Sequence, residues 1–183
     1  MIKSEQHELL SKKKSRAWIW LIIIAFFLAA SLFAFIFYPS MREHSLRSKR
    51  SSSWAAANHI VKSANSAVIE LRQSNAEVGG TYIISSDKAQ NVAVPFDAGK
   101  FYEIAEKYYP DIDRYEYFAV IRNEKCEYCA VTKKRGSSGI IGSYPGSGTS
   151  LAPRLYSTHG EIIIADEDDT LSDLYRYAYD SIF

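Results

Sequence analysis

The chain has 183 residues and a formal net charge of +1, which conceals a gradient along the sequence. Residues 1–16 carry five Lys or Arg against two Glu, residues 39–75 carry six against two acidic residues, and residues 76–183 have a net charge of −6. The acidic distal part argues against a nucleic acid partner, because phosphate binding requires a basic surface.

Residues 17–38 form an uncharged, proline-free apolar stretch, AWIWLIIIAFFLAASLFAFIFY, which predicts a transmembrane helix. At 1.5 Å per residue an α-helix of this length spans about 33 Å, enough for a hydrocarbon core of about 30 Å. Trp18, Trp20 and Tyr38 stand near its two ends, where aromatic rings favour the headgroup layer. The alternative is a cleavable signal peptide, whose apolar region is about 7–15 residues long and ends in small residues, unlike the bulky end here.

Basic residues flank this stretch on both sides. They are Lys12, Lys13, Lys14 and Arg16 before it, and Arg42, Arg47, Lys49 and Arg50 after it. The tighter N-terminal cluster predicts that residues 1–16 are a cytoplasmic tail, which we expect to lack regular structure. Residues 39–53 are a basic juxtamembrane segment, either resting on anionic lipid headgroups or acting as a solvated linker. Residues 54–183 are then an extracytoplasmic domain of an inner (cytoplasmic) membrane protein.

Residues 54–183 alternate helical and strand-like patterns, which predicts an α+β domain with a small antiparallel sheet and flanking helices. The predicted elements are an amphipathic helix over 54–73, strands over 81–85 and 91–94, a helix over 101–108, a hairpin of 115–122 and 126–133, a strand over Glu161–Ala165, and a closing helix over 171–182. Residues 134–153, rich in Gly and Ser, are predicted to be a long exposed loop.

Cys126 and Cys129 are the only cysteines and are a candidate disulfide. A regular strand turns positions three apart to opposite faces, so a bond between them requires a bulge or turn. Two free thiols are the second interpretation. The third is a thiol oxidoreductase site, although such a pair normally opens a helix that lowers the pKa of its first thiol. Two cysteines are too few for a metal centre, and no cofactor is predicted.

Three further motifs favour structural roles. The glycine-rich loop over 136–150 lacks the lysine of a phosphate-binding loop and is predicted to be a flexible or partner-contacting loop. The acidic run Asp166–Asp169 lacks the EF-hand spacing, and together with Thr170 it suits the start of the closing helix. His159 is predicted to be a turn residue beside Gly160, and no Gly-x-Ser-x-Gly elbow is present. The sequence therefore predicts a protein that is not an enzyme.

The N-terminal layout resembles that of type IV pilins and pseudopilins. Lys12–Arg16 matches their basic leader, Pro39 is the twenty-second residue counted from Trp18, and the helix from Trp54 matches their amphipathic continuation. The resemblance implies a cut after Ala17, a sheet wrapped on the helix, and a C-terminal disulfide between the two cysteines. Pilins usually have Gly before the cut and Glu at the fifth mature position, where this chain has Ala17 and Ile22.

The sequence thus supports a leading hypothesis and two alternatives. The leading hypothesis is a non-enzymatic single-pass membrane protein that presents an acidic domain to other proteins of a bacterial envelope assembly. Its partners are the lipid bilayer and other envelope proteins, and the sequence specifies no oligomeric state. The alternatives are a pilin-like or pseudopilin subunit and a membrane-tethered thiol oxidoreductase that uses Cys126 and Cys129.

Overall fold

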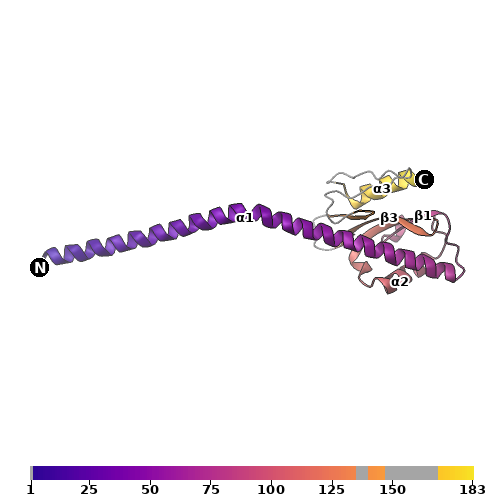
Figure 1. Cartoon of the computed structure of the whole chain (residues 1–183), viewed down its shortest axis with the longest axis horizontal. Helices are drawn as coiled ribbons and strands as arrows, with labels where there is room; N and C mark the ends of the chain where they lie inside the picture. The colour runs from indigo at the N-terminus through magenta and orange to yellow at the C-terminus, as the bar shows by residue number, and fades with distance from the viewer. Residues whose placement is uncertain (1, 135–139, 147–168) are drawn as a thin grey trace. The chain divides into compact units, whose positions relative to one another are not determined.

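The structure, a computed structural model, describes residues 2–134, 140–146 and 169–183. The chain divides into two units, Met1–Ser45 and Leu46–Phe183, and helix α1 (Ile2–Gln73) contributes to both (Figure 1). The predicted strand Glu161–Ala165, the turn residue His159 and the acidic residues Asp166–Asp168 lie outside the described residues.

Helix α1 is longer than its sequence pattern predicts. The expectation of an irregular tail is wrong for Ile2–Arg16, which is helical, and residues 39–53 also continue the helix. Pro39 removes one backbone donor, but extending an existing helix avoids the cost of a new nucleus. The good helix formers between Pro39 and Ser53 are Met41, Arg42, Glu43, Leu46, Arg47, Lys49 and Arg50. Among the described residues, α1 is the one helix long and apolar enough to cross a membrane.

The second unit is built on a four-stranded antiparallel sheet in the order β1-β2-β3-β4, which confirms the α+β class. The strands are β1 (Thr81–Ser85), β2 (Tyr115–Arg122), β3 (Lys125–Lys133) and β4 (Gly142–Tyr144). The predicted β2–β3 hairpin is confirmed. Its two turn residues, Asn123 and Glu124, have φ values of 48° and 68°, as a tight two-residue hairpin turn requires.

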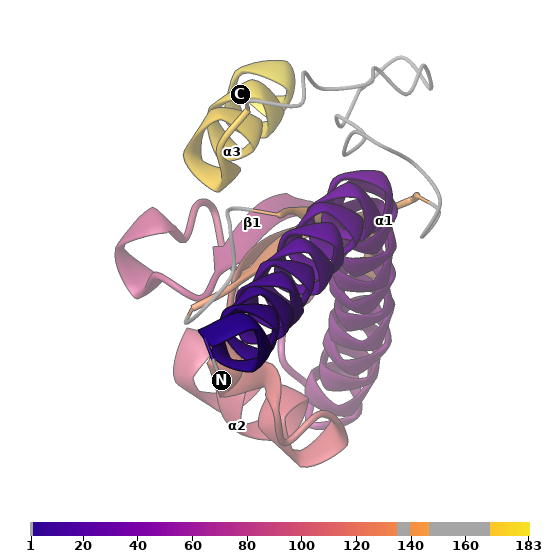
Figure 2. The ribbon, with the colours of Figure 1, turned by 90° about the vertical axis from the view of Figure 1, so that its left-hand side faces the viewer.

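Helices cover both faces of the sheet (Figure 2). The C-terminal part of α1 and helix α2 (Ala98–Tyr108) pack on one face, where Ile60, Val68 and Phe101 join the inward side chains of the strands. Helix α3 (Leu171–Ile182) packs on the other face through Leu174 and Ala178. Successive side chains of a strand point to opposite faces of the sheet, so a strand covered on both faces must be apolar at nearly every position. The long apolar runs of β2 and β3 fit this arrangement.

The shorter elements follow the predicted pattern with one exception. Asp97 caps α2, and Thr170 and Asp173 form a capping box at the start of α3. Of the acidic run predicted to cap α3, Asp166–Asp168 lie outside the described residues, and the carboxylate of the capping box comes from within the helix. Residues 91–94 do not form the predicted strand. Val92 alone bridges to Ile83, after the short helix η1 (Lys88–Gln90). The short helix η2 (Ile112–Arg114) leads into β2.

Strand β4 corrects the prediction of a long exposed loop over 134–153. Gly142 and Ser143 are buried, and β4 pairs with β3 through Cys129–Val131. A Cβ atom on Gly142 would clash with the carbonyl carbon and oxygen of Ser53 in α1, so the strand and helix backbones touch here. The indole Nε1 of Trp54 donates a hydrogen bond of 2.8 Å to the carbonyl oxygen of Gly146. Contact with α1, which no local pattern encodes, therefore orders this segment.

Replacing Gly142 by Ala is expected to destabilise the second unit by about 1–3 kcal/mol, because the added methyl group overpacks against backbone that cannot rotate away. Gly79→Ala is the matched control, since nothing lies within 4 Å of a Cβ there, and its effect is expected to stay within about 0.5 kcal/mol. Urea denaturation of the full chain in detergent micelles measures both. Equal stability of the two variants would contradict the close contact between Gly142 and α1.

Candidate functional site

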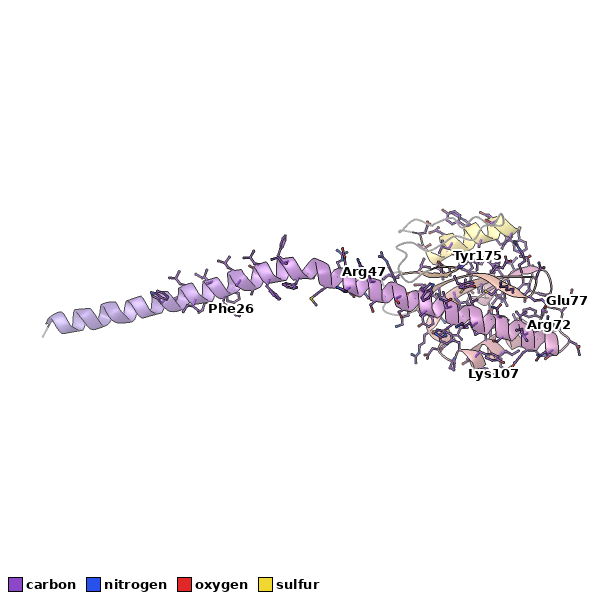
Figure 3. All side chains as sticks on the ribbon, viewed as in Figure 1. Phe26, Arg47, Arg72, Glu77, Lys107 and Tyr175 are labelled. Carbon is purple, nitrogen blue, oxygen red and sulfur yellow. The ribbon has the colours of Figure 1, made fainter. Side chains whose placement is uncertain are left out.

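The first unit carries a long apolar surface. Every described side chain from Trp18 to Tyr38 is exposed, and Trp18, Trp20 and Tyr38 keep 66%, 65% and 71% of their surface. Phe26 points away from the helix axis in Figure 3. A continuous apolar surface of this size is unfavourable in water and marks a membrane or protein contact. The aromatic residues predicted to lie at the membrane interface therefore stand at the two ends of an exposed apolar helix.

The predicted basic residues fall into two groups. Arg42, Arg47 and Lys49 are exposed on α1 beyond the apolar stretch, and Arg50 is half-buried (Figure 3 labels Arg47). The side chains of Lys12, Lys13, Lys14 and Arg16 lie outside the described part of the structure. The described group thus places positive charge on the helix just after its apolar stretch. If the apolar stretch spanned a bilayer, these side chains would lie beside the anionic lipid headgroups.

Cys126 and Cys129 are free thiols in the structure, and both are fully buried. They belong to the core that faces α1, whereas Tyr128 and Ala130 belong to the core that faces α3. Two residues three positions apart in β3 therefore share one face of the sheet. The disulfide between them stays a prediction.

A β-bulge produces this shared orientation. Tyr128 pairs with Val120 and Cys126 pairs with Ile121, so Glu127 is the extra residue that shifts the register. The backbone N–H of Cys126 donates a 2.7 Å hydrogen bond to the side-chain oxygen of Asn65 in α1. A bulge interrupts the ladder hydrogen bonds, and an amide from the packed helix supplies the missing acceptor.

Burial makes both thiols poor nucleophiles. It raises the pKa of Cys126 to about 12, and it raises the pKa of Cys129 well above its ordinary value, with the nearby Cys126 adding to the effect. The Cys126 thiol donates to the carbonyl oxygen of Tyr128 at 3.4 Å. An oxidoreductase pair instead exposes a thiol of lowered pKa at a helix N-terminus. The arrangement in β3 gives no support to the oxidoreductase hypothesis.

A polar cleft of about 340 Å³ lies where β1 ends and α3 begins. Its lining residues are Ser85, Ser86, Asp87, Gln90, Glu116, Lys134, Leu171 and Ser172. The buried Ser85 hydroxyl donates to the carbonyl oxygen of Tyr117 at 3.1 Å and accepts from the N–H of Asp87 at 3.2 Å. The Tyr175 hydroxyl on α3 donates to the carbonyl oxygen of Gln90 at 2.7 Å. These contacts give the polar groups a structural role in joining η1, α3 and the sheet.

Two ion pairs tie α1 to the rest of the second unit. Glu70 accepts from Lys107 at 2.6 Å and from the Tyr108 hydroxyl at 2.8 Å, and Arg72 donates to Glu124 in the hairpin turn at 2.6 Å. The hydrogen bond from Lys107 is the main cause of the lowered pKa of Glu70. Both pairs are solvent-exposed, so they contribute less to stability than the apolar contacts beneath them.

Sequence reasoning missed the residues that make the bulge and its contacts. Asn65 and Trp54 read as ordinary positions of an amphipathic helix, and Gly142 reads as loop. The one available signal for this contact is the amide side chain of Asn65 within the Ala-rich stretch of α1, because a polar group near the core must have a hydrogen-bond partner.

Comparison of the chain with protein-family models, with characterised proteins and with solved structures gives no match. The functional argument therefore depends on the residues and their geometry.

The buried thiols predict that the stability of the reduced protein falls as pH rises above about 8.5, where a thiol ionises in the unfolded chain. In the folded state both pKa values are raised, so only the unfolded state releases these protons over this range. The stabilisation is fully present below pH 8.5, and the expected loss by pH 9.5 is about 1.4 kcal/mol per thiol.

Urea denaturation at several pH values measures this slope. The double variant Cys126→Ala, Cys129→Ala is the control and should show a clearly shallower fall between pH 8.5 and 9.5. The fall that remains is expected from tyrosines of the unfolded chain, which begin to lose protons near their ordinary pKa of about 10, while buried tyrosines such as Tyr82 and Tyr128 have raised pKa values in the folded state. The same slope in both proteins would show that other groups cause it.

Proposed function

We propose that the chain is a non-enzymatic, single-pass membrane protein that presents its second unit for contacts with other proteins of a bacterial envelope assembly. The observation that carries the proposal is the fully exposed apolar surface from Trp18 to Tyr38, on a helix long enough to cross a bilayer. The inner membrane, with the N-terminus in the cytoplasm, suits the cluster Lys12–Arg16 directly before this segment.

The charge of the part of the second unit that follows α1 supports a role in protein contacts. Residues 76–183 have a net charge of −6, which disfavours approach to anionic lipid or nucleic acid. The acidic surface would instead select partners with basic patches, because complementary charge steers encounter and suppresses wrong partners.

A pilin-like subunit is the second candidate, and the continuity of α1 favours it. The helix runs without interruption through Pro39, and its C-terminal part packs on an antiparallel sheet. That order of an apolar helical segment, a proline and a sheet-packed continuation matches the pilin layout. Ile22 stands where pilins usually carry the glutamate that assists assembly, so this candidate suits a minor subunit better than a main filament subunit.

The membrane proposal predicts the effect of charge inside the apolar segment. The double variant Ile24→Arg, Leu28→Arg is expected to lower membrane retention strongly, because each arginine near the centre of a span costs about 2.5–3.5 kcal/mol. Ser51→Arg with Ser52→Arg is the control, since both positions are exposed on the same helix beyond the apolar segment. Alkaline extraction of membranes, followed by immunoblotting, measures retention. Equal retention of the two variants would argue against a membrane span.

The pilin-like candidate predicts that the mature chain begins at Trp18. Intact mass measurement of the protein purified from its own membrane should then show loss of residues 1–17. Ala17→Arg places a bulky charged side chain at the cut and should prevent cleavage, so the measured mass of this variant should be that of the uncut chain. A wild-type protein that retains Met1 would remove this candidate and leave the general membrane-anchor proposal standing.

A further inference from the structure

We infer that residues 86–92, the edge segment, close the outer edge of β1 in place of a fifth strand, and that Asn91 and Tyr102 thereby keep a second copy of the chain from pairing with this edge. The inference concerns the second unit alone. It goes beyond the proposed function, because it identifies an edge of the domain that is withheld from other chains, and it holds whether or not the protein spans a membrane.

Strand β1 stands at one end of the sheet order and pairs with β2 on one side. The N–H and C=O groups on the other side of an edge strand are a template for pairing with another chain. Proteins usually blunt such an edge with lysine, proline or a bulge. The sequence of β1, TYIIS, has no charge and no proline, and its register with β2 is regular. The strand therefore has no such protection of its own.

The outer edge of β1 is nevertheless occupied. Ile83 exchanges two backbone hydrogen bonds of 3.0 Å with Val92, one in each direction. The Ser85 N–H donates to the Asn91 side-chain oxygen at 2.9 Å, and the Ser85 carbonyl oxygen accepts from the Tyr102 hydroxyl at 2.7 Å. One backbone bridge and two side chains thus fill positions that a neighbouring strand would fill.

Helices on both faces of the sheet hold the edge segment. On the α2 side, the Asn91 side-chain N–H donates to the Tyr102 hydroxyl at 2.8 Å, so the two residues that bond Ser85 also bond each other. On the α3 side, the Tyr175 hydroxyl donates to the carbonyl oxygen of Gln90 at 2.7 Å. The segment joins β1 through one isolated bridge instead of a ladder. Loss of the Asn91 and Tyr102 bonds should therefore free the edge while the four-stranded sheet stays intact.

The chain turns away from the edge at Ala93. Its φ value of 52° lies in the left-handed region, which residues other than Gly, Asn and Asp rarely adopt. A regular continuation beyond Val92 would instead extend the pairing along β1 towards Thr81. The turn limits the backbone pairing to one residue pair, so side chains must satisfy the groups of Ser85.

The partner that an open β1 edge fits is β1 of a second copy. An antiparallel pair centred on Ile83 has two-fold symmetry, and it places Thr81 of each copy opposite Ser85 of the other. The same uncharged strand can therefore supply both sides of the interface, and no like charges within β1 oppose each other. Such a pair would join the two sheets into one.

The test measures the oligomeric state of the full chain in detergent micelles by sedimentation equilibrium. The double variant Asn91→Ala, Tyr102→Phe removes the side-chain hydrogen bonds to the Ser85 backbone and keeps the Tyr102 ring. We expect its dimer dissociation constant to be at least about tenfold lower than that of the wild type. Circular dichroism confirms that the variant folds. If the double variant fails to fold, Tyr102→Phe alone provides the comparison.

Hydrogen exchange at low protein concentration, where dimers dissociate, shows whether the edge has opened. The Ile83 and Ser85 amides should exchange faster in the variant than in the wild type, because both lose protection when the edge segment leaves β1. A folded variant with fast exchange at these amides and an unchanged dissociation constant would overturn the proposal. Unchanged exchange would also overturn it, because Asn91 and Tyr102 would then not hold the edge segment.

The matched control is the double variant Asn58→Ala, Tyr108→Phe. It makes the same two chemical changes at residues that bond elsewhere, Asn58 to Trp54 within α1 and Tyr108 to Glu70. We expect the control to keep the wild-type dissociation constant. A control that dimerises as strongly as the edge variant would contradict a specific role for Asn91 and Tyr102.

A rescue variant separates pairing through β1 from association through the apolar segment of α1. Thr81→Lys, added to Asn91→Ala and Tyr102→Phe, places a charge on the open edge strand, and edge lysines disfavour pairing. We expect it to return the dissociation constant to within about threefold of the wild-type value. If the lysine leaves the dimer as strong as before, the copies do not pair through β1.

Discussion

The close packing of α1 on the sheet is the contact on which the rest of the second unit depends. Ala57, Ala64 and Ala67 are almost completely buried there, and their small side chains let the helix backbone approach the strands. Two contacts then become possible. Gly142 can lie against the Ser53 backbone, and Asn65 can reach the β3 backbone. A larger residue on either side would hold the helix away and remove both contacts.

Helix α1 has two parts in which the apolar residues are arranged differently. From Trp18 to Tyr38 the apolar residues surround the axis, as suits contact with lipid on all sides. From Trp54 to Gln73 they occupy one face, and the sheet covers it. Since an α-helix satisfies its backbone hydrogen bonds internally, α1 can carry both arrangements without an irregular segment between them. This is the physical reason that residues 39–53 are helical although their composition resembles a linker.

Most of the fold could be predicted from the sequence because its elements have strong local periodicity. The apolar stretch, the β2–β3 hairpin, α2 and α3 all follow patterns that a few neighbouring residues determine. The failure at β4 has a tertiary cause. Strand β4 is three residues long and lies in a Gly- and Ser-rich part of the sequence, and it forms because it contacts α1 and pairs with β3. The candidate disulfide could be named from two cysteines, but their shared face depends on a bulge that the sequence does not mark.

The bulge shows how a tertiary contact can overrule a local rule. Alternation in β3 predicts opposite faces for Cys126 and Cys129, and the inserted Glu127 reverses that result. The insertion leaves a buried N–H in need of an acceptor, and an unsatisfied group of this kind costs about 1–3 kcal/mol. The Asn65 side chain, 61 residues earlier in the chain, accepts a hydrogen bond from this N–H and so removes the cost. Helix α1 therefore supports the bulge that turns both thiols to one face of the sheet, and the same helix buries them there.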